Sequence, residues 1–118
     1  MKDRYKILND YPNYRIYDDG RIFSIKQNKF LKPHDDGRGY LDVVLYRGKK
    51  EDRKAVKIHV LVARLFVPNP YNNREVNHID GNKQNNHYTN LEWYTRSYNV
   101  RYDLKRRRES AQNNSPLN

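Results

Sequence analysis

The chain contains no cysteine, which excludes structural disulfides and every zinc site built on thiolates. It also has no apolar run near the ~20 residues that a membrane-spanning helix requires. The first residues, Met1–Tyr5, lack the apolar core of a signal peptide. These absences predict a soluble protein that works inside the cell.

Acidic residues are scarce relative to basic ones. The chain of 118 residues has 24 Lys and Arg against 14 Asp and Glu, a formal net charge of +10. Basic side chains gain affinity for a polyanion by releasing its condensed counterions. Eleven Tyr residues add side chains suited both to core packing and to stacking. A nucleic acid is therefore the expected partner of a single small domain.

The first half of the sequence predicts an antiparallel β-meander. Asp19-Gly20 separates two alternating runs and predicts a hairpin, because Gly accepts the positive φ that such turns need. A second turn is expected at 35–39. The expected strands are 14–17, 21–25, 40–46 and 54–58, with a short edge piece at 30–33.

Residues 59–66 predict a buried helix that ties the meander to the rest of the chain. Leu61, Val62 and Leu65 lie on one helical face. Pro68 ends the helix because it cannot donate a backbone hydrogen bond. His59 is expected to be a structural histidine with its hydrogen bonds satisfied at the start of this helix, and DNA contact is the alternative.

The segment 75–108 predicts a ββα unit. Residues 76–79 and 91–95 read as two strands joined by a loop rich in Gly and Asn. Residues 96–108 contain neither Pro nor Gly and read as a helix with Thr95 as its N-cap. The unusual polar residues gather in this unit, so we expect the chemistry there.

The polar residues of this unit suit phosphodiester hydrolysis, which needs an activated water and a cation against the developing charge. His78 can act as a general base. Asn99 falls on the helix, and its amide oxygen suits Mg²⁺, which prefers few protein ligands. Asn90 ends the loop and is placed to fix its geometry. Asn77 points to the opposite strand face unless the chain bends.

These residues resemble the HNH endonuclease motif, in the H-N-N form of phage and intron homing nucleases. The resemblance rests on 77–82, 85–86, 90–93 and Asn99. Residues 59–70 are similar to the helix that precedes the motif in this family. Residues 14–24 resemble a small N-terminal module often attached to these nucleases.

The resemblance implies an α+β fold with a ββα-metal core, and it gives each polar residue a role. His78 is the general base, Asn90 the structural Asn and Asn99 a metal ligand, with Mg²⁺ or another divalent cation such as Mn²⁺ as cofactor. The family often carries Asp where this chain has Asn77. As a ligand Asn77 lacks the carboxylate charge, which implies a lower metal affinity.

The implied partner is double-stranded DNA, with no membrane involved, and monomer and homodimer both stay open. The expected boundaries are 1–57 for a β-rich DNA-contacting module, 58–108 for the nuclease core and 109–118 for a disordered tail. The resemblance also implies a phage-encoded or bacterial protein of the cytoplasm. The candidate DNA contacts are Arg21, Arg38, Arg96, Arg101, Lys105 and Arg106.

Two other interpretations stay open. The same fold without catalysis would be a DNA-binding protein, and Asn77 in place of Asp favours it. An RNA-binding β-domain would explain the charge and the tyrosines but not the spacing of the motif. Taken alone, His78 is by default a hydrogen-bonded structural histidine, and only the whole motif favours catalysis.

Overall fold

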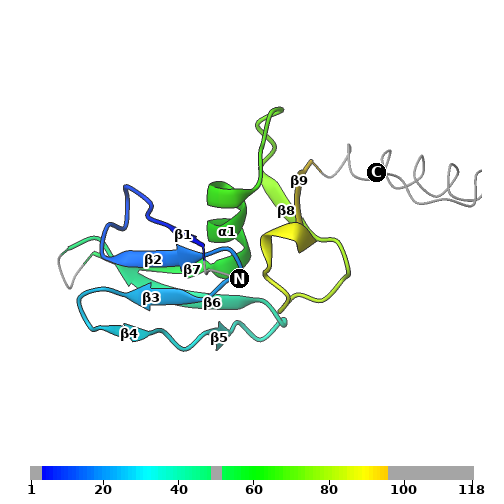
Figure 1. Ribbon diagram of the computed structural model, residues 1–118. Helices are drawn as coiled ribbons and strands as arrows, with labels where there is room; N and C mark the ends of the chain where they lie inside the picture. Colours follow the sequence, from blue (N-terminus) through cyan, green and yellow to red (C-terminus); the bar gives the residue numbers. More distant parts are fainter. Residues whose placement is uncertain (1–3, 49–51, 96–118) are drawn as a thin grey trace, which may run out of the picture.

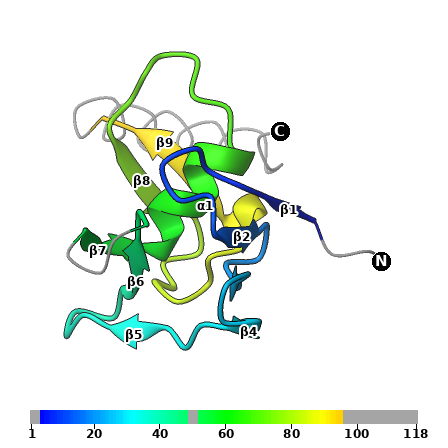
Figure 2. The ribbon, with the colours of Figure 1, turned by 90° about the vertical axis from the view of Figure 1, so that its left-hand side faces the viewer.

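The computed structural model describes residues 4–48 and 52–95 of the chain (Figures 1 and 2). The described part is an α+β fold of short antiparallel strands around one α-helix. In chain order its elements are β1 Tyr5–Lys6, β2 Tyr14–Tyr17, β3 Ile22–Ser24, β4 Lys29–Phe30, β5 His34–Asp35, β6 Leu41–Tyr46, β7 Arg53–Lys57, α1 Ile58–Phe66, β8 Glu75–His78, the 3₁₀ turn η1 Tyr88–Asn90, and β9 Leu91–Tyr94.

The N-terminal strands confirm the expected antiparallel pairing but are divided between two sheets. One sheet has the order β1-β2-β3-β4 and the other the order β5-β6-β7. Pro33 lies between β4 and β5, and proline cannot donate to a strand ladder. Strand β1 was not expected from the sequence. It has only two residues, which pair with Ile16 and Tyr17 at the C-terminal end of β2.

The turn between β2 and β3 forms at the expected Asp-Gly pair. Gly20 has φ +97°, and its amide donates to the Tyr17 carbonyl at 3.0 Å. The carboxylate of Asp19 accepts from the backbone N–H of Arg21 at 3.1 Å. One backbone and one side-chain hydrogen bond therefore fix the turn, as its local sequence predicts.

Helix α1 supplies the centre of the core. Ile58, Leu61 and Val62 are almost completely buried, at the i, i+3, i+4 spacing of one helical face. The helix contacts β2, β6 and β7 on the N-terminal side and β8, η1 and β9 on the other (Figures 1 and 2). Its boundaries agree with the expected helix 59–66 to one residue.

Strand β9 is attached to the end of this helix by a tryptophan. The Trp93 indole N–H lies 3.3 Å from the Ala63 carbonyl and 3.2 Å from the Val67 carbonyl. Ala63 lies in the last turn of α1, and its carbonyl also accepts from the Val67 N–H at 3.0 Å. Val67 is the C-cap residue, so its carbonyl has no N–H donor within the helix. Trp93 therefore positions the β8–β9 pair against the helix.

The expected helix 96–108 and tail 109–118 lie outside the described residues. Within 4–48 and 52–95, no helix is long and apolar enough to cross a membrane.

Leu61→Ala should destabilise the protein by about 2–5 kcal/mol, because a fully buried leucine leaves both lost burial and a cavity. Urea unfolding followed by Trp93 fluorescence measures the change. Ile7→Ala is the matched control, since Ile7 is 45% exposed and should cost about 0.5 kcal/mol or less. Equal losses for both variants would contradict the central place of α1.

Candidate active site

His78 is the last residue of β8 and lies at the end of the β8–β9 ladder, next to the loop that joins the two strands. Val76 faces Trp93 and His78 faces Leu91 in an antiparallel ladder. Side chains alternate along a strand, so Val76 and His78 share the inward face. His78 is only 6% exposed. The strand pair thus holds the imidazole in the interior, close to the loop that follows.

Asn77 lies on the other face of β8, as its strand position predicts. Its amide Nδ2 donates to the Glu92 carboxylate at 3.0 Å, across the ladder. This hydrogen bond does not consume the Oδ1 oxygen, which is the only atom of the amide suited to a hard cation. The structure therefore does not bring Asn77 and His78 together on one face.

Asn90 closes the loop between β8 and β9. Its Oδ1 accepts from the Asp80 backbone N–H at 3.0 Å, and its Nδ2 donates to the Asp80 carboxylate at 2.9 Å. The same Nδ2 donates to the Asn85 carbonyl at 2.8 Å. Its own carbonyl accepts from the Ile79 N–H at 2.8 Å. All of these bonds lie within the loop, which is the geometry expected of an organising residue.

Asp80 also organises the loop, although the sequence predicted only a turn at this residue. Its carboxylate accepts from the Asn85 side chain at 2.9 Å and from the Asn82 backbone at 2.7 Å. The hydrogen bond from Asn85 is the main cause that holds the pKa of Asp80 below its usual value, followed by those from Asn82 and Asn90. The signal in the sequence was the Asp-Gly-Asn run, which favours such local bonds.

Among the described residues, the side chains of Asn86, His59 and Tyr40 contact the His78 imidazole. Its Nε2 lies 2.8 Å from Asn86 Oδ1, and both residues are buried. Its ring centroid lies 4.9 Å from that of His59 and 5.8 Å from that of Tyr40. Asn86 belongs to the recognised motif, but the sequence gave it no role of its own.

His59 is buried beside His78, at the start of α1. Burial is the main cause that lowers the pKa of His59 to about 4, followed by the charge of His78. Its Nδ1 has no hydrogen-bond partner among the described residues. The ring stacks on Tyr40 at 5.1 Å between centroids. His59 is therefore neutral at pH 7. The expected hydrogen bonding of His59 at the helix start is not found for Nδ1 among the described residues.

The described residues supply only part of a metal site. Among them, no group of three or more His, Cys, Asp or Glu is placed to hold a cation. Asn77 offers one amide oxygen, while Asn99 lies outside the described residues. One or two oxygen ligands still fit Mg²⁺, which keeps water and takes phosphate oxygens from a substrate.

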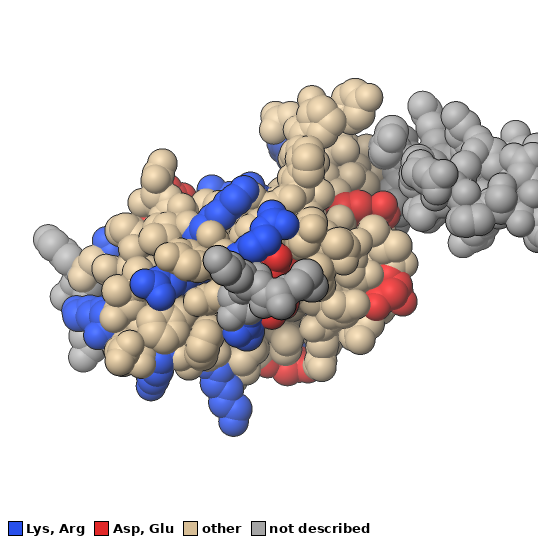
Figure 3. Space-filling view, viewed as in Figure 1, with Lys and Arg blue, Asp and Glu red and all other residues tan. Residues whose placement is uncertain are grey.

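The two candidate DNA contacts that lie in the described residues differ in their surroundings. Arg21 pairs with Asp19 at 2.9 Å and stacks over Tyr17 at 4.6 Å. In the view of Figure 3, Lys and Arg side chains gather over the side formed by the N-terminal strands. The other candidates, Arg96, Arg101, Lys105 and Arg106, lie outside the described residues.

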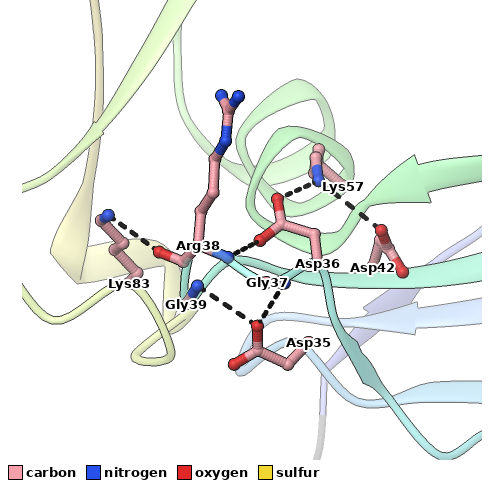
Figure 4. Close-up of polar contacts among 8 residues, drawn as sticks. All are labelled: Asp35, Asp36, Gly37, Arg38, Gly39, Asp42, Lys57 and Lys83. Atoms are coloured by element: carbon pink, nitrogen blue, oxygen red, sulfur yellow. Dashed lines mark hydrogen bonds and ion pairs between the residues drawn. The ribbon is translucent and has the colours of Figure 1, made fainter.

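Arg38 is carried by a turn that polar contacts fix in place (Figure 4). The Asp36 carboxylate accepts from Lys57 and from the Arg38 backbone N–H, and these two bonds are the main causes that lower the pKa of Asp36. Lys83, from the β8–β9 loop, donates to the Arg38 carbonyl at 2.9 Å. Figure 4 shows the exposed Arg38 guanidinium extending away from this network.

The sequence and the structure both match known HNH endonucleases. Residues 56–101 match the family described as HNH endonuclease. The chain is 47% identical over 100 residues to an uncharacterised HNH endonuclease of Acanthamoeba polyphaga mimivirus, with 85% of this chain and 30% of that protein covered. It is 37% identical over 94 residues to the DNA endonuclease I-HmuI of Bacillus phage SP01, covering 80% of this chain and 53% of the relative.

The chain superposes on a solved structure of the HNH homing endonuclease I-HmuI, which concerns DNA binding and cleavage by that enzyme. The TM-score is 0.76 at 35% sequence identity. The superposition covers 87% of this chain and 59% of that one. The chain thus spans about half or less of the length of these curated relatives. Residues 56–101 therefore form an HNH endonuclease domain, as the residues around His78 predicted.

Asn90→Ala should loosen the β8–β9 loop, because the Asp80 N–H loses its acceptor and the Asn85 carbonyl its donor. Amide hydrogen exchange of Asp80 measures this, and we expect it to accelerate by about tenfold or more.

The matched control is Asn69→Ala, since Asn69 closes a different loop through two bonds to Asn73. That variant should leave the Asp80 amide protected. Unchanged exchange at Asp80 in Asn90→Ala would contradict the organising role of Asn90.

Proposed function

We propose that this chain hydrolyses phosphodiester bonds of double-stranded DNA as a metal-dependent endonuclease. The observation that carries the proposal is the placement of His78. It lies buried at the end of β8, with a ring nitrogen held by Asn86, inside the segment that matches the HNH endonuclease family. A buried, oriented imidazole of this kind suits general-base catalysis.

His78 takes the proton of the attacking water in this account. General-base catalysis requires the base to be fixed within hydrogen-bond reach of that water. The ring contacts with His59 and Tyr40 restrict the imidazole plane, which supports such a fixed geometry. Because the pKa of His59 is lowered to about 4, this neighbour carries no charge at pH 7 that would disfavour proton uptake by His78.

Asn90 takes no part in the proton transfer. It closes the loop that returns the chain from β8 to β9, and so fixes the surroundings of His78. We therefore assign it a supporting role.

Asn99 and Asn77 are the proposed ligands of the divalent cation, Mg²⁺ or Mn²⁺. When bound, such a cation supplies positive charge against the scissile phosphate and the leaving 3′ oxygen. Asn77 is already held in orientation by its bond to Glu92, which supports a preorganised amide oxygen.

Arg21 and Arg38 are the proposed DNA contacts of the described residues, together with Arg96, Arg101, Lys105 and Arg106 of the following segment. Both Arg21 and Arg38 sit on turns fixed by a neighbouring aspartate, which lowers the entropy lost when they bind phosphate. The proposed division into 1–57 for DNA contact and 58–108 for cleavage follows from this assignment.

His78→Ala should reduce cleavage of supercoiled plasmid by ~10²–10⁴-fold, which is the usual contribution of a general base. Binding to duplex DNA should be nearly unchanged in a gel shift at matched salt. His34→Ala is the matched control, because His34 is exposed on β5 and should leave cleavage intact. Equal loss of binding and cleavage in His78→Ala would contradict the assigned role.

Removal of divalent cations with EDTA should stop cleavage, and added Mg²⁺ or Mn²⁺ should restore it. The product should be open-circle plasmid if the monomer acts alone, because one ββα unit contains one active site. Linear product would instead indicate a paired enzyme. Full cleavage in the presence of EDTA would contradict metal dependence.

A DNA-binding protein without catalysis is the second candidate. One observation favours it: Asn77 stands where the family often has Asp. Plasmid that stays intact with every divalent cation tried, alongside a clear gel shift, would select this candidate.

A further inference from the structure

The hydrogen bond between His78 and Asn86 contains information about the tautomer of the imidazole. A neutral imidazole has one N–H and one bare nitrogen, and the partner of one nitrogen decides the state of the other. The side-chain oxygen Asn86 Oδ1, which can only accept, lies 2.8 Å from His78 Nε2. With the Asn86 amide oriented in this way, the proton belongs on Nε2 and the lone pair on Nδ1.

Within residues 4–48 and 52–95, no other contact of the ring distinguishes the two tautomers. His59 and Tyr40 face the imidazole through their rings, at centroid distances of 4.9 and 5.8 Å. Such contacts restrict the plane of the ring but do not distinguish one nitrogen from the other. Asn86 is 4% exposed, so its amide is held inside the protein and is not free to turn into solvent.

Asn86 is in turn held by the turn between β2 and β3. A Cβ atom at Gly20 would lie 2.9 Å from the Asn86 Cβ and 3.3 Å from Ile58 Cγ2. Backbone of the turn therefore touches the side chain that holds His78. Next to it, the Tyr88 N–H donates to the Asp18 carbonyl at 2.8 Å, which ties the same loop to the same turn.

We propose that Asn86 is a positioning residue that fixes His78 in the Nε2–H tautomer, and that the Gly20 turn of the N-terminal sheet holds Asn86 in place. In this tautomer Nδ1 is the nitrogen that takes the proton of the attacking water, and this role rests on the proposed nuclease function. The tautomer itself does not depend on that function. The N-terminal strands then contribute to the geometry of the site as well as to the proposed DNA contact.

The experiment is nitrogen-15 NMR of the histidine side chains in the whole chain, above the ordinary pKa of histidine so that the rings are neutral. We expect His78 to show the Nε2–H tautomer. Asn86→Leu, which has similar size and no acceptor, should shift His78 to a mixture of tautomers. Asn86→Asp keeps an acceptor oxygen and should retain the wild-type tautomer.

Gly20→Ala tests the turn, and Gly48→Ala is its matched control. Both glycines have positive φ, so both variants carry the same kind of backbone strain. At Gly48 a Cβ would meet nothing within 4 Å, whereas at Gly20 it would meet Asn86. We expect the His78 tautomer to change in Gly20→Ala and to stay unchanged in Gly48→Ala.

An Nδ1–H tautomer in the wild-type chain would overturn the proposal, and this measurement needs no variant to fold. Unchanged His78 signals in Asn86→Leu would overturn it as well. Equal effects of Gly20→Ala and Gly48→Ala would overturn the part assigned to the turn. The expected tautomer in a chain that cleaves no DNA would contradict the nuclease function and leave the positioning contact standing.

Discussion

The hydrogen bonds of Asn90 across the β8–β9 loop are the constraint on which the site depends. They join the end of the loop at Asn90 to its start at Asp80 and to its middle at Asn85. A loop rich in Gly and Asn would otherwise have high conformational entropy. Once closed, it places Asn86 against His78, and the imidazole acquires a fixed partner.

The site is also built into a core that the whole described chain shares. Helix α1 packs against the N-terminal sheets on one side and against the strands of the site on the other. His59 extends from the start of this helix to the His78 ring, and Trp93 extends from β9 to its end. A change in the N-terminal strands is therefore expected to reach the site through packing, as the contact between Gly20 and Asn86 illustrates.

The elements that the sequence predicted well are those governed by local rules. The Asp19-Gly20 hairpin follows from turn chemistry, and α1 follows from its apolar spacing and from Pro68. His78 and Asn90 were found because their spacing resembles a known motif, and the family assignment is confirmed. The roles of individual site residues stay predictions.

What the sequence did not predict depends on contacts between distant segments. Lys83 and Arg38 are 45 residues apart, and no local pattern indicates that one binds the carbonyl of the other. The approach of Gly20 to Asn86 likewise appears only once the N-terminal turn packs on the loop. The division of the meander at Pro33 required knowing which strands share a ladder, which the alternation of residues does not specify.

In the proposed reaction, water activated at His78 attacks the phosphodiester bond of DNA. The most direct test is cleavage of a duplex in oxygen-18 water with Mg²⁺ present, followed by mass spectrometry of the new ends. We expect one heavy oxygen in the newly formed 5′-phosphate, since the 3′ oxygen leaves. Ends without the label would contradict it, because the nucleophile would then not be water, and so would a duplex that stays intact.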